Sequence, residues 1–449
     1  MRPLKGENLM ALKLTSLGEL NAVGERNCLS IEHPKGAILL DFGIKVPFGQ
    51  QNSADSGFLP DEFYPDMAKV TKLLKDGRLL AVLESHGHLD HAGGYDRLLS
   101  AGVCPLTLAS TFTLEVIRQK ILRGSGVNLK SATATEASVG PFSVTRFPAL
   151  HSIPGSSGFF VEADGIGVLY TGDIKTGVLA RGKSAEKYSF YTDSLKSFGG
   201  AVKYLILDCT NVYEEGYAGI EEDVAPEIEK ILGENPKSRV FISLISSNVL
   251  RIKNIIRAAS VWGRPVYVGG ASIREILRIA QKRNGWKTLD RFSAEVLPQN
   301  AVVIVTGCQG ENGSFLSSIS SGTLKMNLRV RGEDALVISS DTIPMPEIEH
   351  SFSSMITALS GIFGKIYLPN ATPAFKSMGA RLIRRENLHV SGHGKLGDLR
   401  EIMRALKPEV VIPYHGELER RRRMAEFVKN EFGAESIIME QDRVFDLTL

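Results

Sequence analysis

Cysteine is scarce in this sequence of 449 residues. The cysteines are Cys28, Cys104, Cys209 and Cys308. They lie far apart and never form a Cys-x-x-Cys pair, so neither a disulfide framework nor a thiolate metal site is expected. We interpret each of them as a small apolar residue.

Long apolar runs are also missing. No stretch approaches the ~18 residues that a membrane-spanning helix needs. Residues 1–8 include basic side chains, but no apolar segment with a cleavage site follows them, so a secretory signal is not expected. We predict a cytoplasmic protein without a membrane partner.

A charge excess of one sign is nearly absent. The chain has 53 Lys and Arg against 50 Asp and Glu, a net charge of +3, which does not indicate a nucleic-acid partner by itself. A content of 43% hydrophobic and 23% charged residues is typical of a globular protein. The length exceeds one ordinary core and predicts two or three domains.

The order of apolar runs predicts how the chain is organised. Short runs bounded by glycine, proline or charged turns predict strands at 11–15, 28–31, 37–40 and 79–83, and a hairpin over 158–170. After about Ile220, helices and strands alternate, which predicts a parallel sheet covered by helices. The expected elements are a helix over 224–232, a strand over 240–245, a helix from Asn248, a strand over 265–268 and a helix from Ser272.

The last part of the chain is predicted to belong to the same domain as the first part. From about Leu388 we expect a strand, a helix, a strand over 410–413 and a final helix. The simplest arrangement is a host domain, residues 1–212 and 376–449, interrupted by an inserted domain, residues 213–375.

Histidine and aspartate are concentrated after one predicted strand. Residues 86–91 read His-Gly-His-Leu-Asp-His and follow the apolar run that ends at Leu83. These are ligand types of hydrolytic zinc and manganese sites, and exposed loops at strand ends favour active sites. A polar turn that happens to be rich in histidine is the alternative, but three of the nine histidines and a carboxylate fall within six residues. The cluster predicts a metal site.

Four further residues of ligand type stand where an apolar strand ends. They are Asp41, His151, Asp173 and His415. Each of them taken singly is explained as well by a satisfied turn residue. Two metal ions need about seven such groups, however, so the four become candidates once the cluster is considered.

The pattern His-x-His-x-Asp-His, then a lone histidine, then Thr-Gly-Asp resembles the metallo-β-lactamase superfamily, whose fold is an α/β αββα sandwich. The resemblance implies two divalent metal ions, with zinc favoured over manganese. It implies that one ion is held by His86, His88 and His151 and that the other is held by Asp90, His91 and His415. Asp173 matches the carboxylate that is shared by both ions. Asp41 matches a residue that orients the ligand imidazoles.

A long insertion before the last histidine resembles the β-CASP nucleases, and several motifs are similar to those of ribonuclease J. In chain order these are Ser85–His91, His151–Pro154, Thr171–Lys175, Asp208–Asn211, Thr306–Glu311, His389–His393 and Pro413–Glu417. The resemblance therefore covers nearly the whole chain and implies a β-CASP domain with a parallel α/β sheet.

The same resemblance assigns roles beyond the metal ligands. Asp208 and His393 match a pair that helps to protonate the leaving oxygen, although an aspartate that only caps Thr210 and Asn211 is the alternative for Asp208. The residues that would contact RNA phosphate are Ser247, Asn248, His389, Val390, Ser391, Gly392 and His393.

Two features bear on how RNA would be held. Gly269-Gly270-Ala271 stands where the family usually has Gly-Arg-Ser, which leaves a preference for a 5′-monophosphate open. Arginines 420–423 are either a nucleic-acid contact or a solvated helix face. Arg421 shares a helical stripe with Ala425 and Val428, so we expect at least one of these arginines to pack its stem.

We therefore expect a metal-dependent ribonuclease acting on single-stranded RNA, as a 5′-to-3′ exonuclease with endonuclease action as an option, and we leave a homo-oligomer open. Three alternatives compete with it. A DNA nuclease is one, because the sequence shows no reader of the 2′-hydroxyl. A small-molecule hydrolase of this fold is another, although such enzymes rarely carry the long insertion. A non-catalytic RNA-binding scaffold is the third, although no ligand is missing.

Overall fold

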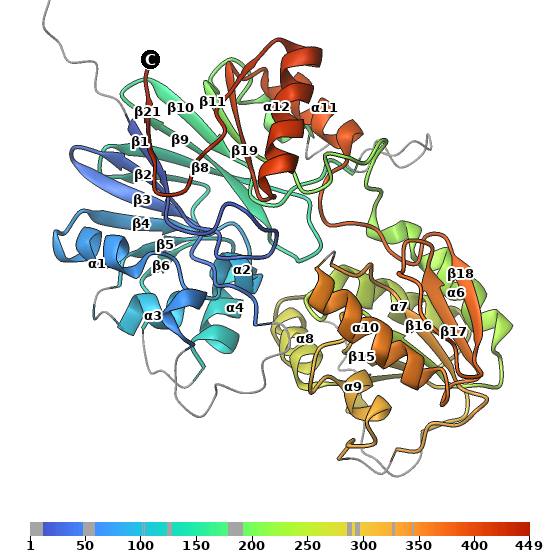
Figure 1. The fold of residues 1–449 in the computed structure, drawn as a ribbon. Helices are drawn as coiled ribbons and strands as arrows, with labels where there is room; N and C mark the ends of the chain where they lie inside the picture. The colour runs from blue at the N-terminus through green and yellow to red at the C-terminus, as the bar shows by residue number, and fades with distance from the viewer. Residues whose placement is uncertain are drawn as a thin grey trace, which may run out of the picture. The chain divides into compact units, whose positions relative to one another are not determined.

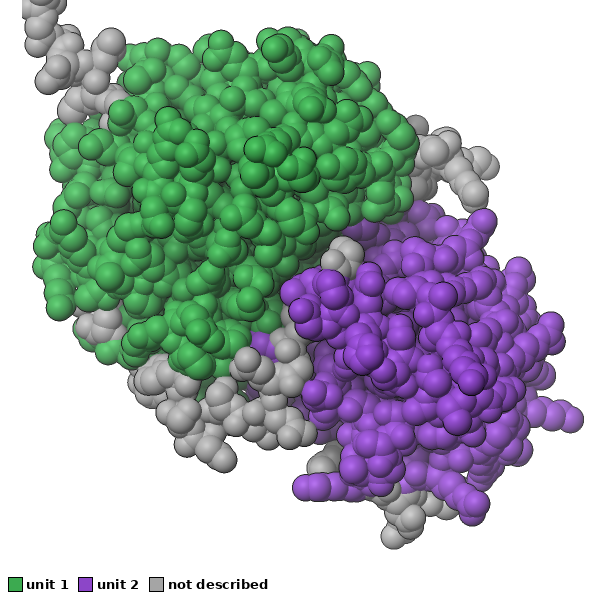
Figure 2. Space-filling view, viewed as in Figure 1, with its two compact units in different colours: residues 1–46, 56–218, 392–449 green, residues 47–55, 219–391 purple. Residues whose placement is uncertain are grey.

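The computed structural model describes residues 12–47, 59–100, 102, 104–123, 128–177, 192–284, 290–291, 297–325, 328–343 and 345–449. The chain divides into two compact units, coloured separately in Figure 2. Unit 1 comprises residues 1–46, 56–218 and 392–449, and unit 2 comprises residues 47–55 and 219–391. The sequence-based boundaries after residues 212 and 375 stay predictions of separately folding domains.

Unit 1 contains two seven-stranded sheets (Figure 1). In spatial order the first has β21 (Val444–Leu447), β1 (Leu12–Ser16), β2 (Leu29–His33), β3 (Gly36–Leu40), β4 (Leu79–Leu83), β5 (Leu106–Leu108) and β6 (Ser131–Ala132). The second has β20 (Glu435–Ser436), β19 (Val410–Tyr414), β11 (Tyr204–Asp208), β10 (Ile166–Tyr170), β9 (Ser157–Ala163), β8 (Phe142–Pro148) and β7 (Glu136–Val139).

The two sheets of unit 1 pack face to face. Alternate residues of a strand point to opposite faces, so Ile38 of β3 enters the core between the sheets while Leu39 enters the core under the helices. The first sheet is covered by α1 (Met67–Lys75), α3 (Tyr95–Ser100) and α4 (Thr111–Val116). The second is covered by α11 (Leu396–Leu406) and α12 (Leu418–Phe432). The predicted αββα sandwich is confirmed.

The strand directions explain where polar side chains gather. β3 and β4 are parallel in the first sheet, and β10, β11 and β19 are parallel in the second. β9 is antiparallel to both β8 and β10, so β8 runs the same way as β10. Within each sheet, the carboxyl ends of these strands therefore meet at one edge.

Unit 2 is built on a seven-stranded sheet in which every strand pair is parallel. Its order is β14 (Asp290–Arg291), β13 (Val266–Gly269), β15 (Val302–Val305), β12 (Val240–Ser243), β16 (Ala335–Ile338), β17 (Lys365–Pro369) and β18 (Arg381–Arg385). Its helices are α6 (Ala225–Glu234), α7 (Val249–Val261), α8 (Ala271–Asn284), α9 (Phe315–Ser320) and α10 (Pro346–Leu359). The predicted parallel sheet with helices is confirmed.

One predicted strand was wrong. Residues 386–394 form no strand, although a strand was expected from about Leu388. The Ser339 hydroxyl donates to the Leu388 carbonyl at 2.7 Å, and the Arg251 guanidinium donates to the Val390 carbonyl at 3.0 Å. Side chains, rather than a neighbouring strand, satisfy this backbone.

Helices in the described ranges are too short or too polar to cross a bilayer. The cytoplasmic location stays a prediction from the sequence.

Candidate metal centre

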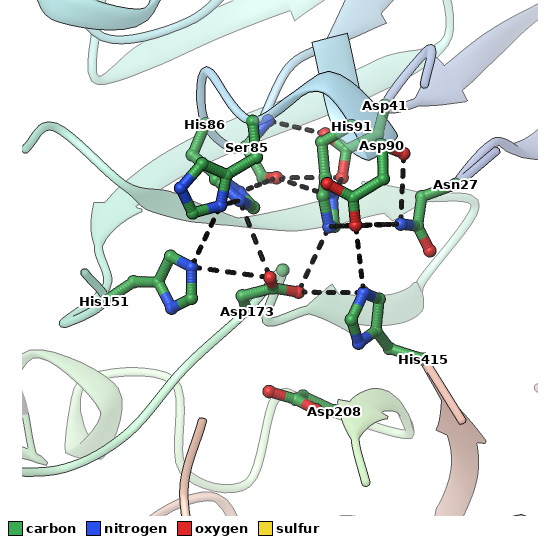
Figure 3. Close-up of polar contacts among 12 residues, drawn as sticks. Asn27, Asp41, Ser85, His86, Asp90, His91, His151, Asp173, Asp208 and His415 are labelled. Atoms are coloured by element: carbon green, nitrogen blue, oxygen red, sulfur yellow. Dashed lines mark hydrogen bonds and ion pairs between the residues drawn. The ribbon is translucent and has the colours of Figure 1, made fainter. Parts of the chain in front are cut away.

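The seven predicted ligands of unit 1 come together at one edge of the sandwich (Figure 3). His86 and His88 follow β4, and Asp90 and His91 lie in the short helix α2 (Leu89–Ala92). The other three follow strands of the second sheet, with His151 after β8, Asp173 after β10 and His415 directly after β19. The shared strand direction accounts for the convergence, because each residue lies beyond the carboxyl end of its strand.

Asp173 lies between two groups of ligand atoms. Its Oδ2 is 3.5 Å from the Nε2 atoms of both His86 and His151. Its Oδ1 is 3.2 Å from His91 Nε2 and 3.7 Å from His415 Nε2. The two oxygens of one carboxylate therefore face two different sets of imidazoles, as Figure 3 shows.

Each of these sets is completed by one more side chain. His88 Nδ1 is 3.0 Å from His86 Nε2 and 3.3 Å from His151 Nε2. Asp90 Oδ2 is 3.5 Å from His91 Nε2 and 3.4 Å from His415 Nε2. In each set the donor atoms lie within 4.8 Å of one another.

Asp41 holds the far side of the His91 ring. Its Oδ2 accepts hydrogen bonds from His91 Nδ1 at 2.6 Å, the Ser85 hydroxyl at 2.8 Å and the Tyr170 hydroxyl at 2.5 Å. A proton on His91 Nδ1 leaves the Nε2 lone pair facing Asp90 and Asp173. The geometry supports the orienting role that the sequence suggested for Asp41.

The remaining imidazoles have their own supports. His151 Nδ1 donates to the Gly392 carbonyl at 2.8 Å, and His415 Nδ1 lies 2.9 Å from the Thr210 hydroxyl. A side chain at residue 392 would collide with the His151 ring, since a Cβ there would lie 2.5 Å from its Cε1. Glycine is therefore required for this carbonyl to reach the histidine.

Two of the site residues have unusual backbones. Asp41 has φ of 60° and His415 has φ of 59°, in the left-handed region that side chains other than glycine seldom adopt. Such conformations persist where surrounding contacts fix them, and they cluster at functional sites.

Burial keeps several of the imidazoles neutral. It lowers the pKa of His88 to about 4 and that of His151 to about 3. Burial alone would raise the pKa of Asp173, but the imidazoles of His415 and His91 hold that pKa well below its usual range. Neutral imidazoles and ionised carboxylates are the forms that bind metal ions.

Asp208 makes contacts that fit both interpretations of its sequence motif, as a cap of the following residues and as a partner of His393. Its Oδ1 accepts from the Thr210 amide at 2.9 Å and from the Thr210 hydroxyl at 2.7 Å, as a capping residue does. Its Oδ2 lies 2.7 Å from His393 Nδ1. Burial would lower the pKa of His393, but the Asp208 and Asp173 carboxylates outweigh it and raise that pKa to about 9. The two carboxylates therefore favour the protonated form of His393.

The site fits divalent metal ions. Asp173 Oδ1 is buried and has no hydrogen-bond partner among the described residues, which a cation would provide. Five imidazoles and two carboxylates are a donor set that zinc and manganese accept.

Asn248 and His389, two of the proposed phosphate-contacting residues of unit 2, share a hydrogen-bond network through Arg251. Asn248 is the N-cap of α7, with its side-chain oxygen accepting from the Arg251 amide at 3.0 Å and its nitrogen donating to Glu221 at 2.9 Å. Arg251 is buried, pairs with Glu221 at 2.8 Å and donates to His389 Nδ1 at 2.9 Å. Ser247 is buried beside this cap, and Val390 and Ser391 follow His389. Gly392 and His393 lie in unit 1.

Several supporting residues escaped the sequence interpretation. Asn27 donates to the Asp90 carbonyl at 3.0 Å and lies 3.1 Å from His91 Nε2. Thr210 and Tyr170 orient His415 and Asp41. Thr210 lies inside a quoted motif, which was a usable signal, whereas Asn27 has no neighbouring pattern.

Three family models match successive parts of the chain. "Metallo-beta-lactamase superfamily" matches residues 22–177, "Ribonuclease J, beta-CASP domain" matches residues 237–359, and "Zn-dependent metallo-hydrolase RNA specificity domain" matches residues 381–439. Together with the relatives below, these matches make the chain similar to ribonuclease J over most of its length. The inserted unit 2 thus carries the β-CASP match.

Relatives in this family match over most of the chain. Ribonuclease J of Corynebacterium glutamicum is 28% identical over 96% of this chain and 57% of its own length. Ribonuclease J of Mycobacterium tuberculosis is 29% identical over 90% of this chain and 69% of its own length. Ribonuclease J2 of Bacillus subtilis is 27% identical over 92% of this chain and 71% of its own length. The chain spans little more than half the length of the first of these relatives.

A solved structure shares the fold. A protein of unknown function from Enterococcus faecalis V583 superposes with a TM-score of 0.63 at 16% identity, over 97% of this chain and 100% of that one. The likeness supports the fold and nothing further.

Proposed function

We propose that this chain is a metal-dependent ribonuclease of the ribonuclease J family that hydrolyses phosphodiester bonds of single-stranded RNA. The observation that carries the proposal is Asp173, whose two carboxylate oxygens face two separate sets of imidazoles. The RNA specificity match over residues 381–439 and the ribonuclease J relatives support RNA as the substrate.

The proposed metal ligands are His86, His88 and His151 for one ion and Asp90, His91 and His415 for the other, with Asp173 shared. Bound metal ions would supply electrophilic stabilisation of phosphate oxygens and a nucleophile at neutral pH. We propose zinc as the ion, supported by the matched description of a zinc-dependent hydrolase and by a histidine-rich donor set. Asp41 and Thr210 fix ring orientations on which this binding depends.

His393 and Asp208 are the proposed proton-transfer pair. The imidazole of His393 lies at the edge of the ligand cluster, with Nε2 3.8 Å from Asp173 Oδ2. Asp208 holds Nδ1, so the Nε2 proton is directed at the cluster. A positioned acid that protonates a departing alkoxide is worth about 10²–10⁴ in rate.

The proposed RNA contacts also bear on how the 5′ end of the RNA is recognised. We propose that Ser247, Asn248 and the loop 389–393 contact RNA phosphates. Gly270 has φ of 117°, and a Cβ there would lie 3.0 Å from the Thr306 side chain. This backbone does not readily accept the arginine that the resemblance to ribonuclease J leads us to expect here. We therefore propose exonuclease action with little discrimination by 5′-phosphate.

The test compares the wild-type protein with Asp173→Asn, which keeps the side-chain shape but loses the shared charge. Zinc-loaded wild type should cut a labelled single-stranded RNA, and the variant should lose at least about 100-fold in rate. Asp164→Asn is the control. Asp164 pairs with His33 at a distance of 2.8 Å, and neither residue is one of the proposed ligands.

Matched substrates decide between the alternatives. RNAs with a 5′-monophosphate, triphosphate or hydroxyl should be cut at similar rates, and the corresponding DNA should be cut far more slowly. Equal cleavage by wild type and Asp173→Asn, or cutting of DNA alone, would contradict the proposal.

A further inference from the structure

Tyr213 is an exposed aromatic residue close to the candidate metal centre. It follows Asp208 by five residues, and 57% of its surface is exposed. Burial of the ring on unit 1 therefore contributes little to folding, since that contribution scales with the apolar area removed from water. The tyrosine is nevertheless held in one place.

Two contacts from the start of α12 fix the ring. The Tyr213 hydroxyl donates to the Glu419 carbonyl at 3.3 Å. The guanidinium of Arg420 lies over the ring, with its central carbon 5.9 Å from the ring centroid. This cation–π contact uses one face of the ring, and more than half of the surface of the residue is exposed.

Arg420 is itself anchored to the metal centre. Its Nε donates to Glu417 at 2.6 Å, and its Nη1 donates to the Thr210 carbonyl. The Thr210 hydroxyl lies 2.9 Å from His415 Nδ1 and 2.7 Å from Asp208 Oδ1. One residue thus connects the guanidinium to a proposed metal ligand and to the proposed proton-transfer pair.

The acidic residues beside Tyr213 are paired with cations. Glu214 lies 2.9 Å from Lys395 Nζ, and Glu215 lies 3.3 Å from Arg400 Nη1. Each of them thus has a cation beside it, and Arg400 also pairs with Glu431 at 2.8 Å. These pairs reduce the negative charge that an approaching polyanion meets.

We propose that Tyr213 and Arg420 form a stacking platform for a nucleobase of the RNA next to the bond that is cut. The inference rests on the proposed function and adds a base-binding position within unit 1. An exposed aromatic face backed by arginine is the element with which single-stranded nucleic acid is held without sequence preference, since every base has a π-face. The ring is already fixed, so little side-chain entropy is lost on stacking.

Binding measurements test the platform separately from cleavage. Full-length protein in EDTA is titrated into a 5′-fluorescein-labelled single-stranded RNA, and the dissociation constant is read from anisotropy. Tyr213→Leu, which keeps apolar bulk but removes the π-face, should weaken binding about 5- to 100-fold. Tyr213→Phe should stay within about twofold of wild type, because the ring remains.

Trp262 provides a matched control, because it is an exposed aromatic residue at the end of α7. Trp262→Ala should leave the dissociation constant unchanged. An RNA carrying a single abasic residue, placed at each position in turn, should bind wild type more weakly at one position near the cut and should show no such minimum with Tyr213→Leu.

The outcomes separate the two proposals. Wild-type RNA cleavage with equal affinities for wild type and Tyr213→Leu overturns the platform and leaves the proposed function standing. RNA binding that depends on Tyr213 without any cleavage by the zinc-loaded protein supports the platform and overturns the proposed function. A wild-type protein that binds no RNA overturns both.

Discussion

Asp41 concentrates three hydrogen bonds on one carboxylate oxygen. Ser85, His91 and Tyr170 all donate to its Oδ2. Bonds to an ionised acceptor are roughly twice as strong as neutral ones, so this carboxylate fixes the His91 ring and its tautomer. The left-handed backbone of Asp41 is the cost of that placement.

Asp41→Asn should weaken metal binding by about 10- to 100-fold, because the amide is a poorer acceptor for His91 Nδ1. The measurement is a zinc titration against a competing chelator. Asp164→Asn is closely matched, since Asp164 also has positive φ, of 52°, and contacts a histidine, His33, at 2.8 Å. Wild-type affinity in Asp41→Asn would show that His91 needs no such support.

Glu311, in the Thr306–Glu311 motif of unit 2, should make stability depend on pH. Burial raises its pKa above the ordinary value of 4.5, so the folded chain keeps this proton to a higher pH than the unfolded chain does. The stability it contributes is complete below the ordinary pKa and is lost as pH rises through the folded value.

Glu311→Gln cannot ionise, so its stability relative to wild type should rise as the pH increases above the ordinary pKa of 4.5. Urea unfolding at several pH values measures the difference. The control is Glu440→Gln, at an exposed position paired with Arg443. A constant difference between Glu311→Gln and wild type across this range would contradict the expectation.

Single residues were predictable where the residue type itself carries chemistry. Three histidines and an aspartate within 86–91 indicate a metal site without any knowledge of the fold. Asn27 and Thr210 are ordinary polar residues, and their roles come from partners 63 and 205 residues away. Sequence spacing holds no information about such distant partners.

At the scale of elements, neighbouring arginines of α12 differ in burial. Only 2% of Arg421 is exposed, and its guanidinium donates to the Met439 carbonyl at 2.6 Å and to Asn21 at 2.9 Å. Arg422 is exposed and pairs with Glu419 at 2.7 Å. The predicted packing of at least one arginine stem is confirmed for Arg421, and this arginine is unavailable for nucleic acid.

Arg421→Met should destabilise the protein by about 2 to 4 kcal/mol, because buried acceptors lose their donor. Arg422→Met should change stability by less than about 0.5 kcal/mol, as expected for an exposed ion pair. Denaturant midpoints at constant m-value measure both. Similar losses in the two variants would mean that burial does not distinguish them.

Elements were predictable where hydrophobic pattern and burial agree. β3, β4, β10 and β19 were expected as strands, and the structure has them at nearly the expected bounds. The segment after Leu388 contains apolar residues, but Arg251 and Ser339 satisfy its carbonyls. Pattern alone cannot distinguish apolar residues of a strand from those of a loop held by distant side chains.

At the scale of the whole molecule, all seven proposed metal ligands belong to unit 1. Metal binding to the folded state stabilises it by about 2.7 kcal/mol at 100 times the dissociation constant. The ligand loops should gain most, because their side chains are the groups proposed to bind the ion.

Adding zinc to metal-free protein should therefore slow amide hydrogen exchange around residues 84–92, 150–152, 171–174 and 413–416. Strands β12 and β15 in the core of unit 2 should show little change. Exchange followed by mass spectrometry makes the comparison within one sample. Equal slowing in both units would contradict a metal site confined to unit 1.

The contact between Asp90 and His415 joins residues 325 positions apart. A growing chain displays the histidine-rich cluster long before the ribosome has made His415. During synthesis, the early histidines can meet metal ions only as an incomplete set, and the late strand β19 must dock before the proposed set is whole. Full loading of the proposed metal site would thus be a late event in the biogenesis of this protein, because it has to wait for the synthesis of His415.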